Sequence, residues 1–175
     1  MNTVFFDVDT QMDFVNPGGA LYVPGAERII GTVAALNRRA MSLGYALVST
    51  VDAHEEDDPE FKIFKPHCIA GTLGQRKPAD TSMHQTIFSK TTTDAFLHSG
   101  LLPLLRNLGG GRYVVYGVVT EICVRFAALG LLKTGARVEV VTDAVRELSL
   151  DAMQQFYADF ESRGGVLTTS AALIS

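Results

Sequence analysis

Short apolar runs rich in β-branched and aromatic residues alternate along this chain with stretches of helical periodicity. The runs are TVFFDVD (3–9), YALVSTVD (45–52), QTIFSK (85–90), GGGRYVVYGVV (109–119), RVEVVTDA (137–144) and GGVLTT (164–169). Strands that read as continuous apolar runs and alternate with helices are typical of a parallel sheet covered on both faces. The sequence therefore predicts an α/β fold of three layers, α/β/α, with a six-stranded, mostly parallel, Rossmann-like sheet.

Helical spacing of apolar residues marks the segments between these runs. We expect helices from Ala26 to Leu43, in one or two short pieces over residues 94–108, from about Thr120 to just before Gly135, and from Leu150 to Arg163. Gly44 is a candidate for the residue that ends the first helix. No repeat or linker interrupts the pattern, so we expect one domain over residues 1–175.

Net charge and cysteine content limit the classes of partner and the cellular location that we expect. The formal net charge is −4 and no Lys/Arg cluster occurs, which argues against nucleic acid or an anionic membrane surface as a partner. Two cysteines give no disulfide framework, the N-terminus has no features of a secretion signal, and no apolar run approaches the roughly 20 residues that span a bilayer. We therefore expect a cytoplasmic protein that acts on a small molecule. We also expect it to be a homo-oligomer.

Ionisable residues stand where several of the predicted strands end. Asp9, Asp52 and Lys90 each close a strand, and the turn from Val119 to Cys123 follows a fourth. In open α/β sheets, ligands bind beyond the carboxyl ends of the strands. We therefore expect these side chains to face one common edge.

Cys123 is the most informative of them. A buried cysteine is usually an inert small hydrophobe, whereas a cysteine in the first turn of a helix lies where the backbone favours a thiolate. A carboxylate such as Asp9 could take the thiol proton, and an ammonium such as Lys90 could stabilise the negative charge. The joint presence of the three groups favours nucleophilic catalysis.

A second set of residues lies in VDAHEEDDPEFKIFKPHC (51–68). Asp52, His54, His67 and one of the acidic residues between them offer oxygen and imidazole ligands suited to Zn²⁺, Mn²⁺ or Fe²⁺. The alternative is a solvated acidic loop with incidental histidines. Cys68 is either a buried thiol without a role in the site or a further metal ligand.

Four stretches resemble the isochorismatase-like cysteine hydrolases and, within them, the nicotinamidases (pyrazinamidases). These stretches are FFDVDTQMDF (5–14), VDAHEEDDPEFKIFKPHCIAGTLG (51–74), FSKTTTDAF (88–96) and YGVVTEICVRFAALGLLKTGARVEVVTDA (116–144). They cover most of the chain in the family's order. The combination of D-x-Q-x-D-F, P-H-C-x-x-G-T and G-V-x-T-x-x-C is specific.

The resemblance implies a catalytic triad of Asp9, Lys90 and Cys123. It also implies a cis peptide bond between Val118 and Val119, and an oxyanion hole made by the backbone N–H groups of Val119 and Cys123. The expected reaction is hydrolysis of nicotinamide, or of a related heteroaromatic amide, to the acid and ammonia through a thioester.

The resemblance further implies one divalent metal ion (Zn, Mn or Fe) that binds the ring nitrogen of the substrate. Its ligands correspond to Asp52, His54 and His67, with Glu60 as the fourth. The expected substrate-binding residues are Phe14, Phe64, Val118 and Val119.

One departure from the family pattern concerns the substrate. Many nicotinamidases carry an aromatic residue shortly after the lysine, where this chain has Thr93 and Asp94, so Phe14 or Phe64 would have to supply the stacking wall. Another amidase or carbamoyl hydrolase of the same superfamily is therefore the alternative. A non-catalytic metal-binding or redox-sensing protein using Cys123 or Cys68 is the rival of a different class.

Overall fold

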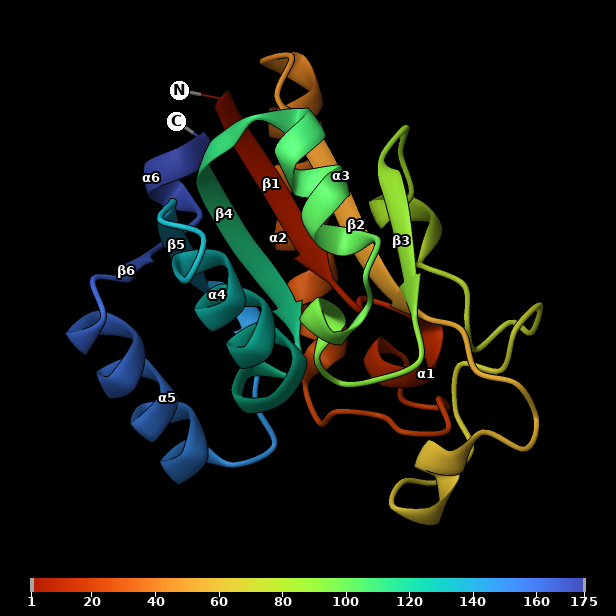
Figure 1. The fold of residues 1–175 in the computed structure, drawn as a ribbon. Coiled ribbons are helices and arrows are strands. Elements are labelled where there is room, and N and C mark those ends of the chain that lie inside the picture. The colour runs from red at the N-terminus through yellow and green to blue at the C-terminus, as the bar shows by residue number, and fades with distance from the viewer. Residues whose placement is uncertain (1, 175) are drawn as a thin grey trace.

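The six strands form one sheet with helices on both faces, which confirms the predicted fold class (Figure 1). The computed structural model describes residues 2–174. The strands are β1 (Asn2–Val8), β2 (Ala46–Asp52), β3 (Thr86–Lys90), β4 (Gly110–Val118), β5 (Arg137–Arg146) and β6 (Val166–Thr168). Their order is β3-β2-β1-β4-β5-β6, and every neighbouring pair is parallel.

Each predicted helical segment contains an α-helix, and shorter helices lie beside or between these segments. The α-helices are α1 (Met12–Val15), α2 (Ile30–Ser42), α3 (Leu101–Leu108), α4 (Arg125–Leu132), α5 (Leu150–Ser162) and α6 (Ala171–Ile174). The 3₁₀ helices are η1 (Ala26–Ile29), η2 (Pro59–Lys62), η3 (Ala79–Thr81) and η4 (Ala95–Leu97), and η5 (Thr120–Val124) is a π-helical turn. Helices α3, α4 and α5 cover one face of the sheet and α2 covers the other (Figure 1).

Several predicted boundaries were wrong by a few residues. The first predicted helix begins as η1, and the one-turn helices α1 and α6 were not predicted because one turn is too short to show periodicity. Gly44, with a φ of 66°, ends the first helix as predicted. Strand β1 stops at Val8 because Asp9 has a φ of 49°, and β5 runs on to Arg146.

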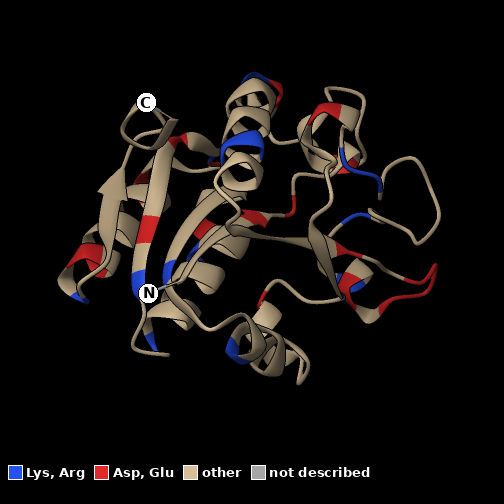
Figure 2. Cartoon of the chain, turned by 90° about the horizontal axis from the view of Figure 1, so that it is seen from above, with Lys and Arg blue, Asp and Glu red and all other residues tan. Residues whose placement is uncertain are grey.

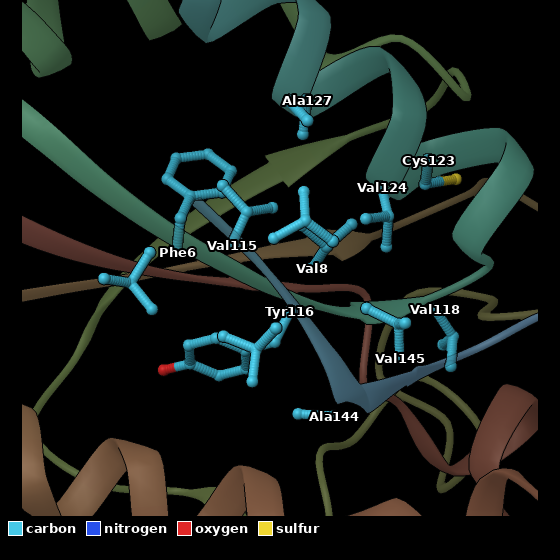
Figure 3. Packing of buried hydrophobic residues seen from close by; sticks show 14 of the residues in the cluster. Phe6, Val8, Val115, Tyr116, Val118, Cys123, Val124, Ala127, Ala144 and Val145 are labelled. Atoms are coloured by element: carbon cyan, nitrogen blue, oxygen red, sulfur yellow. The ribbon is translucent and has the colours of Figure 1, made fainter. Parts of the chain in front are cut away.

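Alternate residues of the strands pack on opposite faces of the sheet. Figure 3 shows Phe6, Val8 and Val115 beneath α4, whereas Tyr116 lies on the other face, toward α2. On the α2 face, Asn37 donates a hydrogen bond of 3.0 Å to the fully buried carboxylate of Asp7 and accepts one of 2.6 Å from the Tyr116 hydroxyl. Apolar packing therefore holds both faces of the sheet, and the α2 face contains a buried polar network as well.

The order of strands reverses between β1 and β4, at the centre of the sheet, because β2 and β3 follow on one side of β1 and β5 and β6 follow on the other side of β4. A crevice forms at such a point because the connections leave β1 and β4 toward opposite faces, and this crevice is where doubly wound folds bind ligands. The long connection between β2 and β3 lies beyond the carboxyl ends of these strands (Figure 1). Lys and Arg residues are scattered over several elements (Figure 2). Among residues 2–174, no helix is long and apolar enough to cross a bilayer.

Candidate active site

Asp9, Lys90 and Cys123 meet at the carboxyl edge of the sheet. Nζ of Lys90 lies 2.8 Å from Oδ2 of Asp9 and 3.9 Å from Sγ of Cys123. Lys90 comes from β3, two strands away from β1, so its long side chain crosses the end of β2 to reach Asp9. The three residues are at most 8% exposed, which places the group of charges in a medium of low polarity.

Two features set the position of Asp9. Its left-handed backbone turns the chain immediately after β1, and its N–H still donates to the carbonyl of Thr50 at 3.1 Å. The hydroxyl of Thr50 donates to Oδ1 at 2.7 Å. Burial raises the pKa of Asp9, and the positive charge of Lys90 offsets part of this rise. A carboxyl group with a raised pKa is a better proton acceptor for a thiol than an ordinary aspartate.

Lys90 lies between two carboxylates. Its Nζ is 2.5 Å from Oδ1 of Asp52 in addition to its contact with Asp9. Burial disfavours the ammonium, but the charges of Asp9, Cys123 and Asp52 outweigh burial and raise the pKa of Lys90 well above its ordinary value. Lys90 is therefore a permanent cation beside the thiol.

Cys123 lies in η5, one turn before α4. Figure 3 shows its sulfur pointing away from the apolar cluster that the neighbouring Val124 enters. Burial raises the pKa of the thiol well above its ordinary value, and the positive charge of Lys90 offsets only part of this effect. Burial thus opposes the thiolate that the start of a helix favours. The thiol needs a base to react, and Asp9, whose Oδ2 lies 2.8 Å from the Lys90 ammonium beside the thiol, is placed to act as one.

The peptide bond between Val118 and Val119 is cis, as the resemblance implied. Gly117, just before it, has a φ of 122°, and a Cβ there would lie 2.0 Å from the carbonyl oxygen of Val8. Val118 is 1% exposed and packs in the core, whereas Val119 begins the turn that carries Cys123. The two valines predicted to touch substrate therefore flank the cis bond, and their contact with substrate stays a prediction.

A second group of side chains lies beside the triad. Among the described residues, one set of potential metal ligands has its ligand atoms within 4.8 Å of one another, and it consists of Asp52, His54 and His67. Oδ2 of Asp52 lies 3.9 Å from Nε2 of His54 and 3.7 Å from Nε2 of His67. Nδ1 of His67 lies 2.7 Å from the carbonyl oxygen of Lys65, which fixes the ring with Nε2 facing Asp52.

The surroundings of His54 fit a cation. Both ring nitrogens are buried, and neither makes a hydrogen bond of good geometry. Burial disfavours the charged ring, yet the carboxylates of Asp52 and Asp58 outweigh it and raise the pKa of His54 to about 8. Burial also opposes the charge of Asp52, but Lys90 and the two histidines lower its pKa. The pocket thus attracts positive charge, and a divalent ion would replace the proton. Two imidazoles and one carboxylate are a donor set found in catalytic zinc sites.

Glu60, the predicted fourth ligand, is not among the residues of this cluster. Burial raises its pKa, and the charge of Asp52 acts in the same direction. Asp58, from the same acidic loop, lies closer, since its Oδ2 is 3.0 Å from Nδ1 of His54. The order of the acidic residues in the sequence gave no basis for predicting which of them would face His54.

Aromatic rings border the metal cluster. The ring of Phe14 is 5.4 Å from that of His67, and the ring of Phe64 is 6.3 Å from it. Phe61, which the sequence interpretation missed, lies 5.2 Å from His54 and 5.6 Å from His67. A cavity of about 470 Å³ lies beside these rings, and its lining is Asp58, Pro59, Glu60, Ile63, Phe64, Thr91, Thr92 and Thr93.

Two further residues were missed, although the sequence held a signal for each. Thr50 is a polar residue within an apolar strand, and its hydroxyl holds Asp9. Gln11 stands two positions after Asp9, is fully buried and bonds to the backbone of Asp52. A polar side chain in or next to a buried strand needs a partner, and here the partners are site residues.

The family model described as Isochorismatase domain matches residues 3–172. The chain belongs to the isochorismatase family. A zinc complex of the pyrazinamidase of Pyrococcus horikoshii is similar to this isochorismatase-family protein with a TM-score of 0.90 and 31% identity, over 97% of this chain and 99% of that chain. The nicotinamidase/pyrazinamidase of Mycobacterium tuberculosis is 29% identical over 164 residues, 82% of this chain and 86% of the relative.

A maleamate amidohydrolase of Pseudomonas putida is 25% identical over 180 residues, 93% of this chain and 80% of that relative. Both of these relatives are named for the hydrolysis of an amide. This chain is a hydrolase of the same family, which favours catalysis over the non-catalytic alternative.

Proposed function

We propose that this protein hydrolyses nicotinamide, or a closely related heteroaromatic amide, to the carboxylic acid and ammonia. The observation that carries the proposal is the position of Lys90, whose ammonium contacts Asp9 and Cys123 on one side and the Asp52 of the histidine cluster on the other. A nucleophile and a cation site therefore share one crevice. The zinc-bound pyrazinamidase with a TM-score of 0.90 supports this proposal.

In the proposed reaction, Asp9 takes the proton of the Cys123 thiol as sulfur attacks the amide carbon. The carbonyl oxygen gains negative charge, which the N–H groups of Val119 and Cys123 would stabilise. Asp9 then returns the proton to the leaving nitrogen, so that ammonia departs and a thioester remains. In the second half, Asp9 deprotonates a water molecule that attacks the thioester and then returns the proton to the departing sulfur, so that the acid leaves and the free thiol of Cys123 is restored. Lys90 stays protonated throughout.

Asp52, His54 and His67 would hold one divalent metal ion, zinc, manganese or iron, with Glu60 as the proposed fourth ligand. When bound, the ion supplies a Lewis acid that binds the ring nitrogen of the substrate. Phe14, Phe61 and Phe64, which border the two histidines, would enclose an aromatic ring. Cytoplasmic location and a homo-oligomeric state stay predictions.

The test is ammonia release from nicotinamide, together with trapping of the intermediate. The wild-type protein should release ammonia and, after rapid acid quench, carry a nicotinoyl group on Cys123 that mass spectrometry detects. Cys123→Ala should lose activity by about 10⁴-fold or more, because the covalent route is removed. A Cys123→Ala variant that keeps a tenth of the activity would overturn the thioester mechanism. Cys68→Ala is the matched control, since Cys68 is also a buried free thiol but lies outside the triad.

The alternative substrate is an aliphatic amide or a carbamoyl compound. Thr91, Thr92 and Thr93 favour it, because they line the cavity with hydroxyl groups where an aromatic wall was expected. The maleamate amidohydrolase among the relatives supports the same alternative substrate class. Comparison of kcat/KM for nicotinamide, benzamide and maleamate decides between the two, since a preference for maleamate would replace nicotinamide as the substrate.

A further inference from the structure

The side chain of Gln11 extends the sheet where the backbone of β1 has already turned away. Strands β1 and β2 pair in register up to Val8 and Thr50, and the N–H of Asp9 makes a last bond to the carbonyl of Thr50. Asp52 lies two residues farther along β2, beyond the end of β1. Its backbone on this side therefore has no strand neighbour.

The carboxamide of Gln11 takes the place of that missing neighbour. Oε1 accepts a hydrogen bond of 2.7 Å from the N–H of Asp52, and Nε2 donates one of 2.7 Å to the carbonyl of the same residue. Nε2 donates a second bond of 2.8 Å to the carbonyl of Gln75, in the connection between β2 and β3. The amide of Gln11 is fully buried, and its nitrogen and its oxygen both make hydrogen bonds.

Because the backbone of Asp52 is held in place, the point from which its carboxylate side chain extends is fixed. That carboxylate contacts Lys90 through Oδ1 and faces both histidines of the cluster through Oδ2. A small rotation of this backbone would move the carboxylate relative to three partners at once. Side chains behind the ligands of a metal site commonly change metal affinity when they are removed.

We propose that Gln11 is a positioning residue, which sets the affinity for the metal ion and the place of Lys90 by clamping the backbone of Asp52. The proposal rests on the function proposed above, because it takes Asp52 as a metal ligand and as a partner of Lys90. Gln11 does not touch the reacting atoms and acts through Asp52 alone. Its removal should therefore change metal binding in the absence of any substrate.

Asn37 provides a matched control. It too is a fully buried amide with three hydrogen bonds, two donated to Asp7 and to the carbonyl of Thr81 and one accepted from Tyr116. It lies on α2, and its bonds reach none of the site residues. Gln11→Met and Asn37→Leu each replace a buried amide by an apolar side chain of similar size, so both variants lose a comparable set of hydrogen bonds.

The experiment measures zinc affinity by chelator competition on purified, folded, substrate-free protein. Gln11→Met should weaken zinc binding about 10- to 100-fold, whereas Asn37→Leu should stay within about twofold of wild type, even if the two unfold at similarly reduced temperatures. Equal zinc affinity in the two variants would overturn the proposal. If Gln11→Met does not fold, Gln11→Asn is judged by the same criterion, because it keeps an uncharged amide but is one methylene shorter than the bonds to Asp52 and Gln75 require.

A second measurement separates this proposal from the function on which it rests. A wild-type protein that binds no zinc would refute the proposed metal site, and the rate of Cys123 alkylation by iodoacetamide would then decide the role of Gln11. Gln11→Met should change that rate at least about threefold relative to Asn37→Leu, because Lys90 beside the thiol loses a fixed carboxylate partner. Identical alkylation rates would overturn the proposal in that case.

Discussion

The hydroxyl of Thr50 donates a hydrogen bond of 2.7 Å to Oδ1 of Asp9, and both side chains are fully buried. This bond occupies one oxygen of the carboxylate and leaves Oδ2 for Lys90. It also lowers the pKa of Asp9, against the larger effect of burial, which raises it. Thr50 thus influences both the orientation and the basicity of the proposed base.

The first prediction concerns the pH dependence of kcat/KM. Asp9 must be ionised to accept the thiol proton, so activity should fall as the pH drops through its pKa, and this limb should lie above the ordinary aspartate value of 3.8. Thr50→Val removes a bond that lowers this pKa. The limb should then move to higher pH, and kcat at the optimum should fall about tenfold as the carboxylate loses its orientation.

Thr81→Val is the control for that variant, because Thr81 is also fully buried but its hydroxyl donates to the carbonyl of Pro78, which is not a site residue. Its pH profile should coincide with that of wild type. An unshifted acidic limb in Thr50→Val would show that Asp9 is not the group that titrates.

The second prediction is that Asp9, Lys90 and Cys123 act as a unit. Lys90→Met and Asp9→Asn should each lower kcat by about 10³-fold or more, yet either change should add little to Cys123→Ala, because effects within a catalytic unit are non-additive. Lys77→Met is the control, since Nζ of Lys77 lies 2.9 Å from Oδ2 of the buried Asp7, outside the site. Losses that multiply in the double variants would show separate roles.

The third prediction distinguishes substrate binding from generation of the nucleophile. Removal of the metal by a chelator, or His67→Ala, should mainly raise KM for nicotinamide and affect benzamide much less, because benzamide lacks the ring nitrogen. His84→Ala, which changes an exposed histidine, should leave both values unchanged. Equal losses for the two amides on chelation would remove the proposed role of the metal.

The fourth prediction concerns Gly117, just before the cis peptide bond. Gly117→Ala should destabilise the protein by more than about 3 kcal/mol, because the new Cβ would lie 2.0 Å from a carbonyl oxygen of β1 and the φ of 122° is unfavourable for alanine. Gly135→Ala, with a φ of 83° but no atom within 4 Å, should cost only about 1–2 kcal/mol. Chemical denaturation measures both, and equal losses would mean that the contact with β1 is relieved without cost.

The sequence by itself determined the elements and the chemical character of their ends. Apolar runs such as residues 45–52 are local signals, since each strand of a parallel sheet is buried on both faces and must be apolar along its length. The polar residues at the ends of these runs, Asp9, Asp52 and Lys90, were therefore identifiable as site candidates. Their family motifs also indicated the cis bond before Val119, which the structure contains.

The tertiary structure alone decided how these residues meet. The strand order places β2 between β1 and β3, so Lys90 reaches Asp9 only by passing Asp52, and no local pattern encodes that order. Burial of Cys123, which raises its pKa, arises from packing by several elements and is invisible in the residues around it. The clamp of Gln11 on Asp52 joins positions 41 residues apart. The sequence around either residue does not indicate which residue will be its partner. Such contacts are therefore decided by how the chain folds in three dimensions.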